Sequence, residues 1–375
     1  MPNVSELDKV KMGIEEFLSE WQNESATVLV HTSGSTGEPK PMWVEKRRME
    51  ASARMTCQFL GLHEGDTALL CMSLDYIAGK MMVVRAITCG LRLLTVPPTG
   101  HPLALPPSSF PLPPSPSTMS GVARIRASNL PLPPSPSTPP IDFAAMVPMQ
   151  VWNSLQVPEE RERLMAIRHL IIGGGAIDDA LARSLVDFPN QVWSTYGMTE
   201  TLSHIAMRRL NGPDATDWYT PLPGVSLSQT ADCCLVIDAP ALHDGLLVTN
   251  DIVETSPQLI HPSPDSVVRF RVLGRKDNVI CSGGIKIQAE EVERLLRAHL
   301  RVPYIITKRR DPKFGEIVVL LTEGDTTDAE AVCRDVLPKY WQPRAYVHTD
   351  HIPLTETGKT ARKEAEQLVC QLPSR

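Results

Sequence analysis

Helix-type and strand-type hydrophobic patterns alternate along residues 45–96, and this alternation limits the folds open to the chain more than any other feature. Helical spacing near 45–60 is followed by the apolar run TALLCMS, by helical spacing near 77–89 and by LRLLTV. The alternation continues with IDFAAMVP at 141–148, a helix over about 150–166, RHLIIGG, a helix over 178–187 and QVWSTYG at 191–197. Such alternation predicts a parallel-type sheet with helices packed on it.

The two ends of the chain add further elements. Residues 4–21 have helical spacing, and the strand pattern ATVLV follows at 26–30. DCCLVIDA and GLLVTND are β-rich, and the composition changes near 277, where a glycine turn precedes the amphipathic stretch AEEVERLLRAHL. We therefore predict an α/β chain with a large domain over 1–275, whose mixed or parallel sheets are flanked by helices. A separate, small α+β domain would follow over 278–375.

Composition narrows the function classes. A net charge of −6 disfavours binding to nucleic acid or to anionic membranes. The N-terminus is polar and acidic, unlike a signal peptide, and the apolar stretch 67–90 is interrupted by Asp75 and Lys80, which argues against a membrane span. Eight cysteines without CxxC spacing predict buried thiols in a reducing cytosol rather than a disulfide framework or a metal site.

Fifteen of the 34 prolines fall within residues 97–140, where PLPPSPST occurs twice, at 111–118 and 131–138. Two copies are too few for a solenoid. We interpret the segment as a polyproline-rich surface insert, with a ligand for a proline-binding domain or a lid over the site as alternatives.

The stretch HTSGSTGEPKP at 31–41 concentrates glycines and hydroxyl residues before Lys40. Backbone N–H groups of such a loop can surround an anion, although the spacing is not that of a Walker loop. Taken alone, the stretch is more simply interpreted as a plain solvated loop.

Further motifs change that interpretation. GGGAI at 173–177, YGMTE at 196–200, TND at 249–251, GRKDNVICSGGIKIQAEEVE at 274–293 and TETGKTAR at 355–362 follow in order. With the glycine loop, this series resembles the adenylate-forming superfamily of acyl-CoA synthetases, peptide-synthetase adenylation domains and luciferases. The resemblance covers nearly all of the chain outside the proline-rich insert, which has no counterpart in the family pattern.

The resemblance implies a role for each motif. Phosphates of ATP would be bound by Thr32, Ser33, Gly34, Ser35, Thr36, Gly37 and Lys40. Tyr196 would stack on adenine, Thr199 would contact the α phosphate and Glu200 would hold Mg²⁺. Asp251 and Arg275 would contact the ribose or phosphate, with Gly174 and Gly175 beside the nucleotide or the acid. Lys359 would be the catalytic lysine, and the turn Ser282, Gly283 and Gly284 would line the tunnel for coenzyme A. Lys276 and Asp277 would form the hinge about which the small domain turns.

The implied reaction joins a carboxylic acid to coenzyme A, with ATP and Mg²⁺, through an acyl-adenylate. The early position of the glycine loop and the stretches at 141–155 and 196–212 are similar to short bacterial o-succinylbenzoate-CoA ligases of menaquinone synthesis. For that acid the expected pocket residues are Phe143, Ser203 and His204. A ligase for another aryl or fatty acid, or a non-catalytic adenylate-binding relic, is the alternative.

Overall fold

The computed structural model describes residues 6–31, 41–113, 140–175, 177, 179–256, 268–354 and 360–372. The chain divides into two compact units. Unit 1 comprises Met1–Ser226 and Asp238–Leu246, and unit 2 comprises Leu227–Ile237 and Leu247–Arg375. Of the described residues, no helix is both long and apolar enough to cross a membrane.

Unit 1 is built on an eight-stranded sheet in the order β10-β9-β8-β7-β6-β3-β4-β5. Its strands are β3 (Thr67–Leu70), β4 (Arg92–Thr95), β5 (Ser108–Phe110), β6 (Phe143–Met146), β7 (His169–Ile172), β8 (Gln191–Gly197), β9 (His204–Arg209) and β10 (Thr220–Pro221). The five strands from β8 to β4 are parallel, and the outer strands pair antiparallel. The predicted α/β class and mixed sheet are confirmed.

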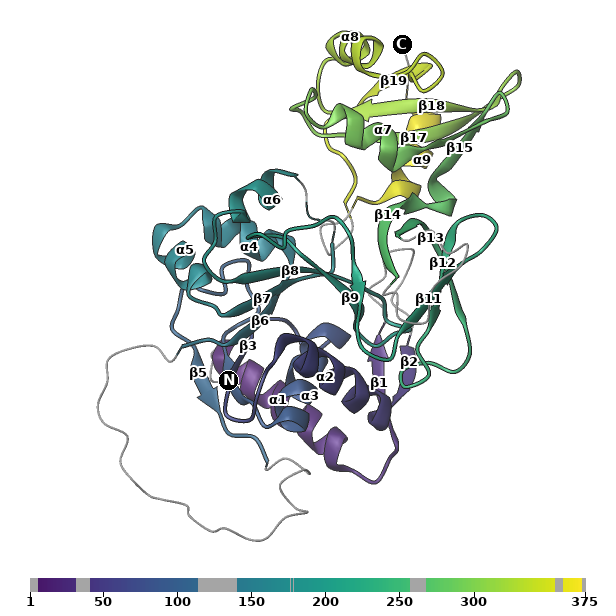
Figure 1. Ribbon diagram of the computed structural model, residues 1–375. Helices are drawn as coiled ribbons and strands as arrows, with labels where there is room; N and C mark the ends of the chain where they lie inside the picture. Colours follow the sequence, from purple (N-terminus) through teal and green to yellow (C-terminus); the bar gives the residue numbers. More distant parts are fainter. Residues whose placement is uncertain are drawn as a thin grey trace, which may run out of the picture. The chain divides into compact units, whose positions relative to one another are not determined.

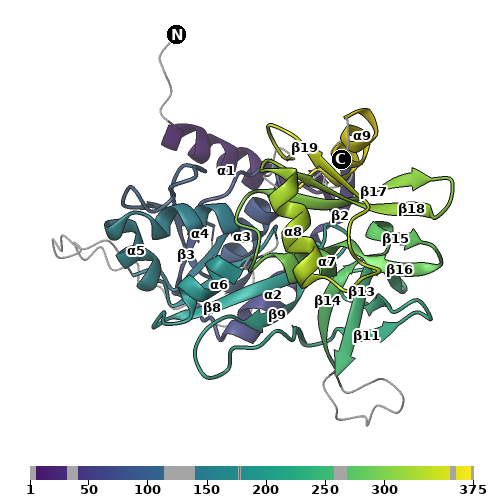
Figure 2. The ribbon, with the colours of Figure 1, turned by 90° about the horizontal axis from the view of Figure 1, so that it is seen from above.

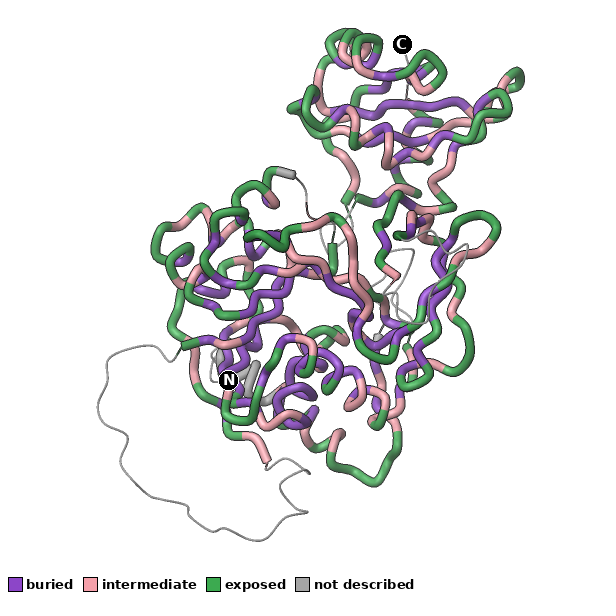
Figure 3. The backbone as a smooth tube through the Cα atoms, in the orientation of Figure 1, coloured by how far each residue is buried: buried purple, intermediate pink, exposed green. Residues whose placement is uncertain are grey.

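Helices cover both faces of this sheet (Figure 1). One face carries α2 (Lys46–Leu60) and α3 (Ile77–Cys89), and the other carries α4 (Pro148–Leu155), α5 (Pro158–Met165) and α6 (Asp179–Leu185). Side chains of the central strands point alternately toward one helix layer and toward the other, so these strands are buried on both faces. Figure 3 shows the buried residues along the middle of the sheet. The unit also contains α1 (Glu6–Gln22).

One detail of unit 1 differs from the sequence prediction. The helix expected over 150–166 is two helices, because Pro158 has no N–H to continue α4 and instead starts α5. The strand expected at 26–30 is confirmed as β1 (Thr27–His31), which pairs with β2 (Pro41–Glu45) in a separate two-stranded sheet.

Unit 2 contains two antiparallel-rich sheets. The first has the order β11-β12-β13-β14, with β11 (Ser226–Gln229), β12 (Cys234–Asp238), β13 (Leu247–Ser256) and β14 (Arg269–Arg275). The second contains β15 (Val279–Ser282), β16 (Ile285–Gln288), β17 (Tyr304–Asp311), β18 (Gly315–Thr322) and β19 (Ala345–His348). A short 3₁₀ turn, Lys276–Asn278, joins β14 to β15.

Three helices pack on the second sheet. Val292 and Leu296 of α7 (Ala289–Leu296) share a core with Ala329 and Cys333 of α8 (Thr326–Val336), and the two helices lie side by side in Figure 2. Ala365 and Val369 of α9 (Arg362–Gln371) belong to a separate core with Val319 and Leu321. The sheet is therefore covered on both faces.

The cysteine prediction is only partly right. Cys57, Cys71, Cys234 and Cys333 are buried and Cys89 is half-buried, but Cys233, Cys281 and Cys370 are exposed. All eight thiols are free.

Candidate functional site

Two of the sequence motifs in unit 1 lie at neighbouring strand ends. Gly173, Gly174 and Gly175 follow β7, and the YGMTE motif ends β8. Since β7 and β8 are parallel, their carboxyl ends meet at the same edge of the sheet. In open α/β sheets this edge is where ligands bind. Gly174 has a φ of 77°, a left-handed backbone that favours glycine.

The turn between β8 and β9 is tightly held. A Cβ on Gly197 would collide with the backbone of Ser203 and His204, so only glycine fits there. The Thr201 hydroxyl lies 3.1 Å from the Met198 nitrogen and 2.8 Å from the Ser203 carbonyl oxygen. This bonding fixes the turn that carries Thr199 and Glu200.

Within that turn the two predicted phosphate-side residues differ in exposure. Thr199 is buried, whereas Glu200 is exposed and forms no ion pair within the described part of the chain. An exposed, unneutralised carboxylate is chemically suited to a hard cation such as Mg²⁺ that also binds phosphate oxygens. No group of three or more acidic, histidine or cysteine side chains able to hold a metal occurs in the described ranges.

Tyr196 packs against a second tyrosine. Its ring centroid lies 5.9 Å from that of Tyr219, with the planes tilted by 57°. The Tyr219 hydroxyl lies 2.8 Å from Ser194 Oγ, and the Arg208 guanidinium lies 5.4 Å from the Tyr219 ring centroid. The stacking of adenine on Tyr196 stays a prediction.

The three expected acyl-pocket residues lie around an arginine that the sequence analysis missed. Arg85, on α3, is only 2% exposed, and its guanidinium carbon lies 6.0 Å from the ring centroid of the fully buried Phe143. Arg85 Nη2 donates to Ser203 Oγ at 2.7 Å. Burial lowers the pKa of Arg85 to about 10, so the side chain is still charged at neutral pH.

Arg85 lacks the partner that a buried cation needs. In the described ranges it contacts no carboxylate, and its Nε has no hydrogen-bond acceptor. A buried guanidinium without a counter-charge is costly. The sequence signal was present: Arg85 is the one arginine in the apolar helical stretch IAGKMMVVRAITC.

A directed hydrogen-bond chain extends from Arg85 through His204. Thr56 Oγ1 donates to the Ser52 carbonyl at 3.1 Å, so it accepts from His204 Nε2, also at 3.1 Å. His204 Nδ1 is then the bare nitrogen, 3.3 Å from the Ser203 hydroxyl. Burial, reinforced by Arg85, lowers the pKa of His204 well below its usual range. His204 is therefore neutral and orients Ser203 toward Arg85.

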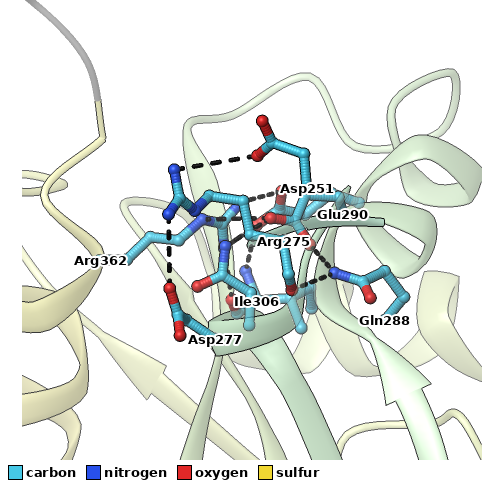
Figure 4. Close-up of polar contacts among 9 residues, drawn as sticks. Asp251, Arg275, Asp277, Gln288, Glu290, Ile306 and Arg362 are labelled. Carbon is cyan, nitrogen blue, oxygen red and sulfur yellow. Dashed lines mark hydrogen bonds and ion pairs between the residues drawn. The ribbon is translucent and has the colours of Figure 1, made fainter. Parts of the chain in front are cut away.

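Three of the predicted residues in unit 2 come together (Figure 4). Asp251 on β13 and Arg275 on β14 are register partners, with Arg275 Nη1 3.8 Å from Asp251 Oδ1. Arg275 Nη2 lies 3.4 Å from Asp277 Oδ2, which also accepts from Asn250 Nδ2 at 3.3 Å. The neighbouring Lys276 forms an exposed ion pair with Asp232 at 2.8 Å.

The predicted coenzyme A turn is a two-glycine hairpin between β15 and β16. Ser282 and Ile285 are register partners, and Gly283 and Gly284 have φ values of 58° and 85°. A Cβ on Gly284 would meet nothing within 4 Å, so that position faces open space. Paired positive φ values are the reason for two glycines here.

The remaining predicted residues lie outside the described residues: Thr32, Ser33, Gly34, Ser35, Thr36, Gly37, Lys40 and Lys359. The residues that flank them are described. His31 and Pro41 are register partners at the ends of β1 and β2, and Leu354 and Thr360 form an isolated antiparallel bridge.

The chain is similar to several known proteins. A 2-succinylbenzoate–CoA ligase of Bacillus thuringiensis subsp. konkukian (strain 97-27) is 24% identical over 372 residues, which cover 93% of this chain and 71% of the relative. An acyl-CoA synthetase (AMP-forming)/AMP-acid ligase II-like protein from Dyadobacter fermentans DSM 18053 is 29% identical, with a TM-score of 0.59 and coverage of 98% of this chain and 95% of that one.

A third similarity concerns the fold alone. The o-succinylbenzoate coenzyme A synthetase of Bacillus subtilis, solved in complex with ATP and magnesium ion, is 20% identical with a TM-score of 0.66, covering 90% of this chain and 69% of that one. The sequence profile of AMP-binding enzymes matches residues 4–238. The chain belongs to the family of AMP-binding, adenylate-forming enzymes.

Proposed function

We propose that the chain is an ATP-dependent acid–CoA ligase acting in the cytosol, and that its acid carries a second carboxylate, with o-succinylbenzoate of menaquinone synthesis as the first candidate. The observation that carries this choice is Arg85, a buried guanidinium without a carboxylate partner in the described ranges, beside Phe143 and Ser203. A substrate carboxylate would supply the missing counter-charge, and the Phe143 ring an apolar wall for an aromatic acid.

The names of the relatives support the same substrate, since the Bacillus thuringiensis protein is a 2-succinylbenzoate–CoA ligase. Chain length does not support it, because this chain aligns with only 71% of that relative. The choice of acid therefore depends on the pocket chemistry.

The proposed first step forms the acyl-adenylate. A carboxylate oxygen of the acid attacks the α phosphorus of ATP, and the bond from that phosphorus to the departing pyrophosphate breaks. The glycine loop from Thr32 to Gly37 and Lys40 would bind the pyrophosphate, Thr199 the α phosphate, and Lys359 both the acid and the α phosphate. Mg²⁺ neutralises phosphate charge when bound, and Glu200 would hold it.

The nucleoside contacts in this proposal follow the sequence motifs. Tyr196 would stack on the adenine, and Asp251 would accept hydrogen bonds from the ribose hydroxyls. Arg275, which lies 3.8 Å from Asp251, would orient that carboxylate and reach the ribose or phosphate. Gly174 and Gly175 would let the ligand approach the backbone at the end of β7.

In the proposed second step the thiol of coenzyme A attacks the acyl carbonyl carbon, its proton is released, and the bond to AMP breaks. Ser282, Gly283 and Gly284 would line the path of the pantetheine arm. The hinge at Lys276 and Asp277, with the small domain turning between the two steps, remains a proposal that rests on the sequence motif.

A panel of acids tests the proposed function. With ATP, Mg²⁺ and CoA present, AMP release should be fastest with o-succinylbenzoate and slower with benzoate and with fatty acids. A clear preference for benzoates or fatty acids would contradict the choice of substrate. No AMP release with any acid would favour the non-catalytic alternative.

The glycine turn gives a prediction that separates the two steps. Gly284→Trp should leave acyl-adenylate formation within about threefold of wild type and reduce thioester formation by about 100-fold, because the indole would fill the path of the pantetheine arm. Gly284→Asn is the matched control, since asparagine tolerates a positive φ and is small. Equal loss of both steps in Gly284→Trp would refute the assignment of this turn.

A further inference from the structure

The start of α9 is fixed by a bidentate ion pair to α7. Arg362, the first residue of α9, places Nη2 2.7 Å from Glu293 Oε2 and Nη1 3.1 Å from Glu293 Oε1. Two parallel charge-assisted bonds set the orientation of the guanidinium as well as its position.

The pair is also bound to β17. The Ile306 carbonyl accepts from Arg362 Nη1 at 3.1 Å, and the Ile306 N–H donates to Glu293 Oε1 at 2.9 Å. Burial raises the pKa of Glu293, and the facing guanidinium offsets that effect only in part. Burial acts to lower the pKa of Arg362, but Glu293 outweighs it and the pKa is raised. With bonds to both α7 and β17, the partly exposed Arg362 side chain is held in one orientation.

A second carboxylate links the pair to the 275–278 segment. Glu290, one turn before Glu293 on α7, lies 3.9 Å from Arg362 Nε and accepts from Asn278 Nδ2. Gln288 Nε2 donates both to Glu290 and, at 2.9 Å, to the Arg275 carbonyl. The first residue of α9 and the residues after β14 therefore belong to one connected network.

Arg362 lies three residues after Lys359 in the chain. Between them, Thr360 pairs with Leu354, and the Ala361 N–H donates to the Pro353 carbonyl at 2.9 Å. Leu354 and Thr360, on either side of residues 355–359, are thus paired with each other, and Thr360 continues through Ala361 into Arg362. The position of Arg362 therefore bears on where Thr360 is held.

We infer that Arg362 and Glu293 are positioning residues for Lys359 in acyl-adenylate formation. The inference rests on the proposed function, in which Lys359 acts in the first step and not in the second. Shifting a catalytic group by about 1 Å can cost about 100-fold in rate. A pair that only stabilises unit 2 would affect both steps alike, so the two steps must be measured separately.

The test uses the full chain with Arg362→Lys and Glu293→Gln. The first step is measured by exchange of pyrophosphate into ATP with o-succinylbenzoate, and the second by thioester formation from synthetic acyl-adenylate and CoA. We expect the first rate to fall by about 10- to 100-fold and the second to stay within about threefold. Arg362→Lys keeps the charge and loses the two-pronged geometry, so the loss in this variant measures orientation rather than charge.

Glu291→Gln is the matched control. Glu291 lies on the same helix and receives two bonds from Arg294, at 2.8 and 2.5 Å, but contacts neither Arg362 nor the segment before it. Both rates should remain at wild-type values in this variant. A loss as large as in Glu293→Gln would overturn the inference.

Glu293→Asp keeps the test decisive if the other variants unfold. It retains the charge, withdraws it by one methylene, and should show the same selective loss at an unchanged melting temperature. Equal losses in both steps, or no loss in either, would overturn the inference. If none of the acids tested supported pyrophosphate exchange by the wild-type chain, the proposed function itself would be refuted. The two failures are therefore distinct.

Discussion

Replacing Arg85 with methionine should lower kcat/KM for o-succinylbenzoate by about 100-fold and leave that for benzoate within about threefold. The reason is that truncating one partner of a buried charge pair costs about 2–5 kcal/mol, with tenfold in affinity for every 1.4 kcal/mol. Benzoate lacks the second carboxylate, so it has no ion pair with Arg85 to lose. The measurement is AMP release with each acid over a range of concentrations.

The same substitution should stabilise the chain without ligand. Methionine fills a similar volume without burying an unpaired charge, so the melting temperature of the apo protein should rise by about 2 °C or more. Loss of substrate selectivity together with a gain in stability is typical of a residue kept for binding. A purely structural arginine would give the opposite result, with a lower melting temperature and equal effects on all acids.

Two further variants sharpen the Arg85 test. Arg85→Lys keeps a cation without the planar fork, and its loss with o-succinylbenzoate should be smaller than that of Arg85→Met. Arg54→Met is the matched control, because Arg54 lies on α2 of the same unit and pairs with Glu50 on the surface. It should alter neither the preference among acids nor, beyond about 1 °C, the melting temperature.

Lys359→Ala should reduce the rate of acyl-adenylate formation by about 100- to 1000-fold. Removing one hydrogen-bond donor to a charge that develops in the transition state has an effect of this size in other enzymes. Lys359 is expected to neutralise charge on the acid and the α phosphate as the new bond forms. The expected readout is loss of pyrophosphate exchange. Thioester formation from supplied acyl-adenylate should persist.

Lys363→Ala controls for the loss of any lysine from this part of the chain. Lys363 lies on α9, just past the segment that carries Lys359. Its removal should leave both steps at wild-type rates. If Lys359→Ala itself left pyrophosphate exchange unchanged, the proposed mechanism would be wrong.

Local patterns predict much of the fold. The helix expected over 77–89 is α3 with the same bounds, and Gly90 closes it with a φ of 68°. The strand expected over 191–197 is β8. Both segments are rich in apolar residues and have a glycine at the end, so the local signal and the tertiary packing agree.

Other features depend on contacts that are remote in sequence. The apolar stretch around Arg85 marks it as unusual, but its hydrogen bond to Ser203, 118 residues further along the chain, cannot be read from the local pattern. The pairing of Asp251 with Arg275 depends on the register of β13 and β14, which the motifs do not specify. The break at Pro158 was visible in the sequence, yet helical periodicity on both sides of it favoured a single helix.

The path of the chain between the two units has a practical consequence. Residues 227–237 belong to unit 2, 238–246 return to unit 1, and 247 onward belong to unit 2 again. The returning stretch is attached within unit 1, where Arg48 Nη2 lies 2.6 Å from Asp244 Oδ2 and Arg48 Nη1 donates to the Leu242 carbonyl. No single cut in the gene therefore yields two fragments that each encode a whole unit, and producing either unit separately requires a new linker that joins its two segments.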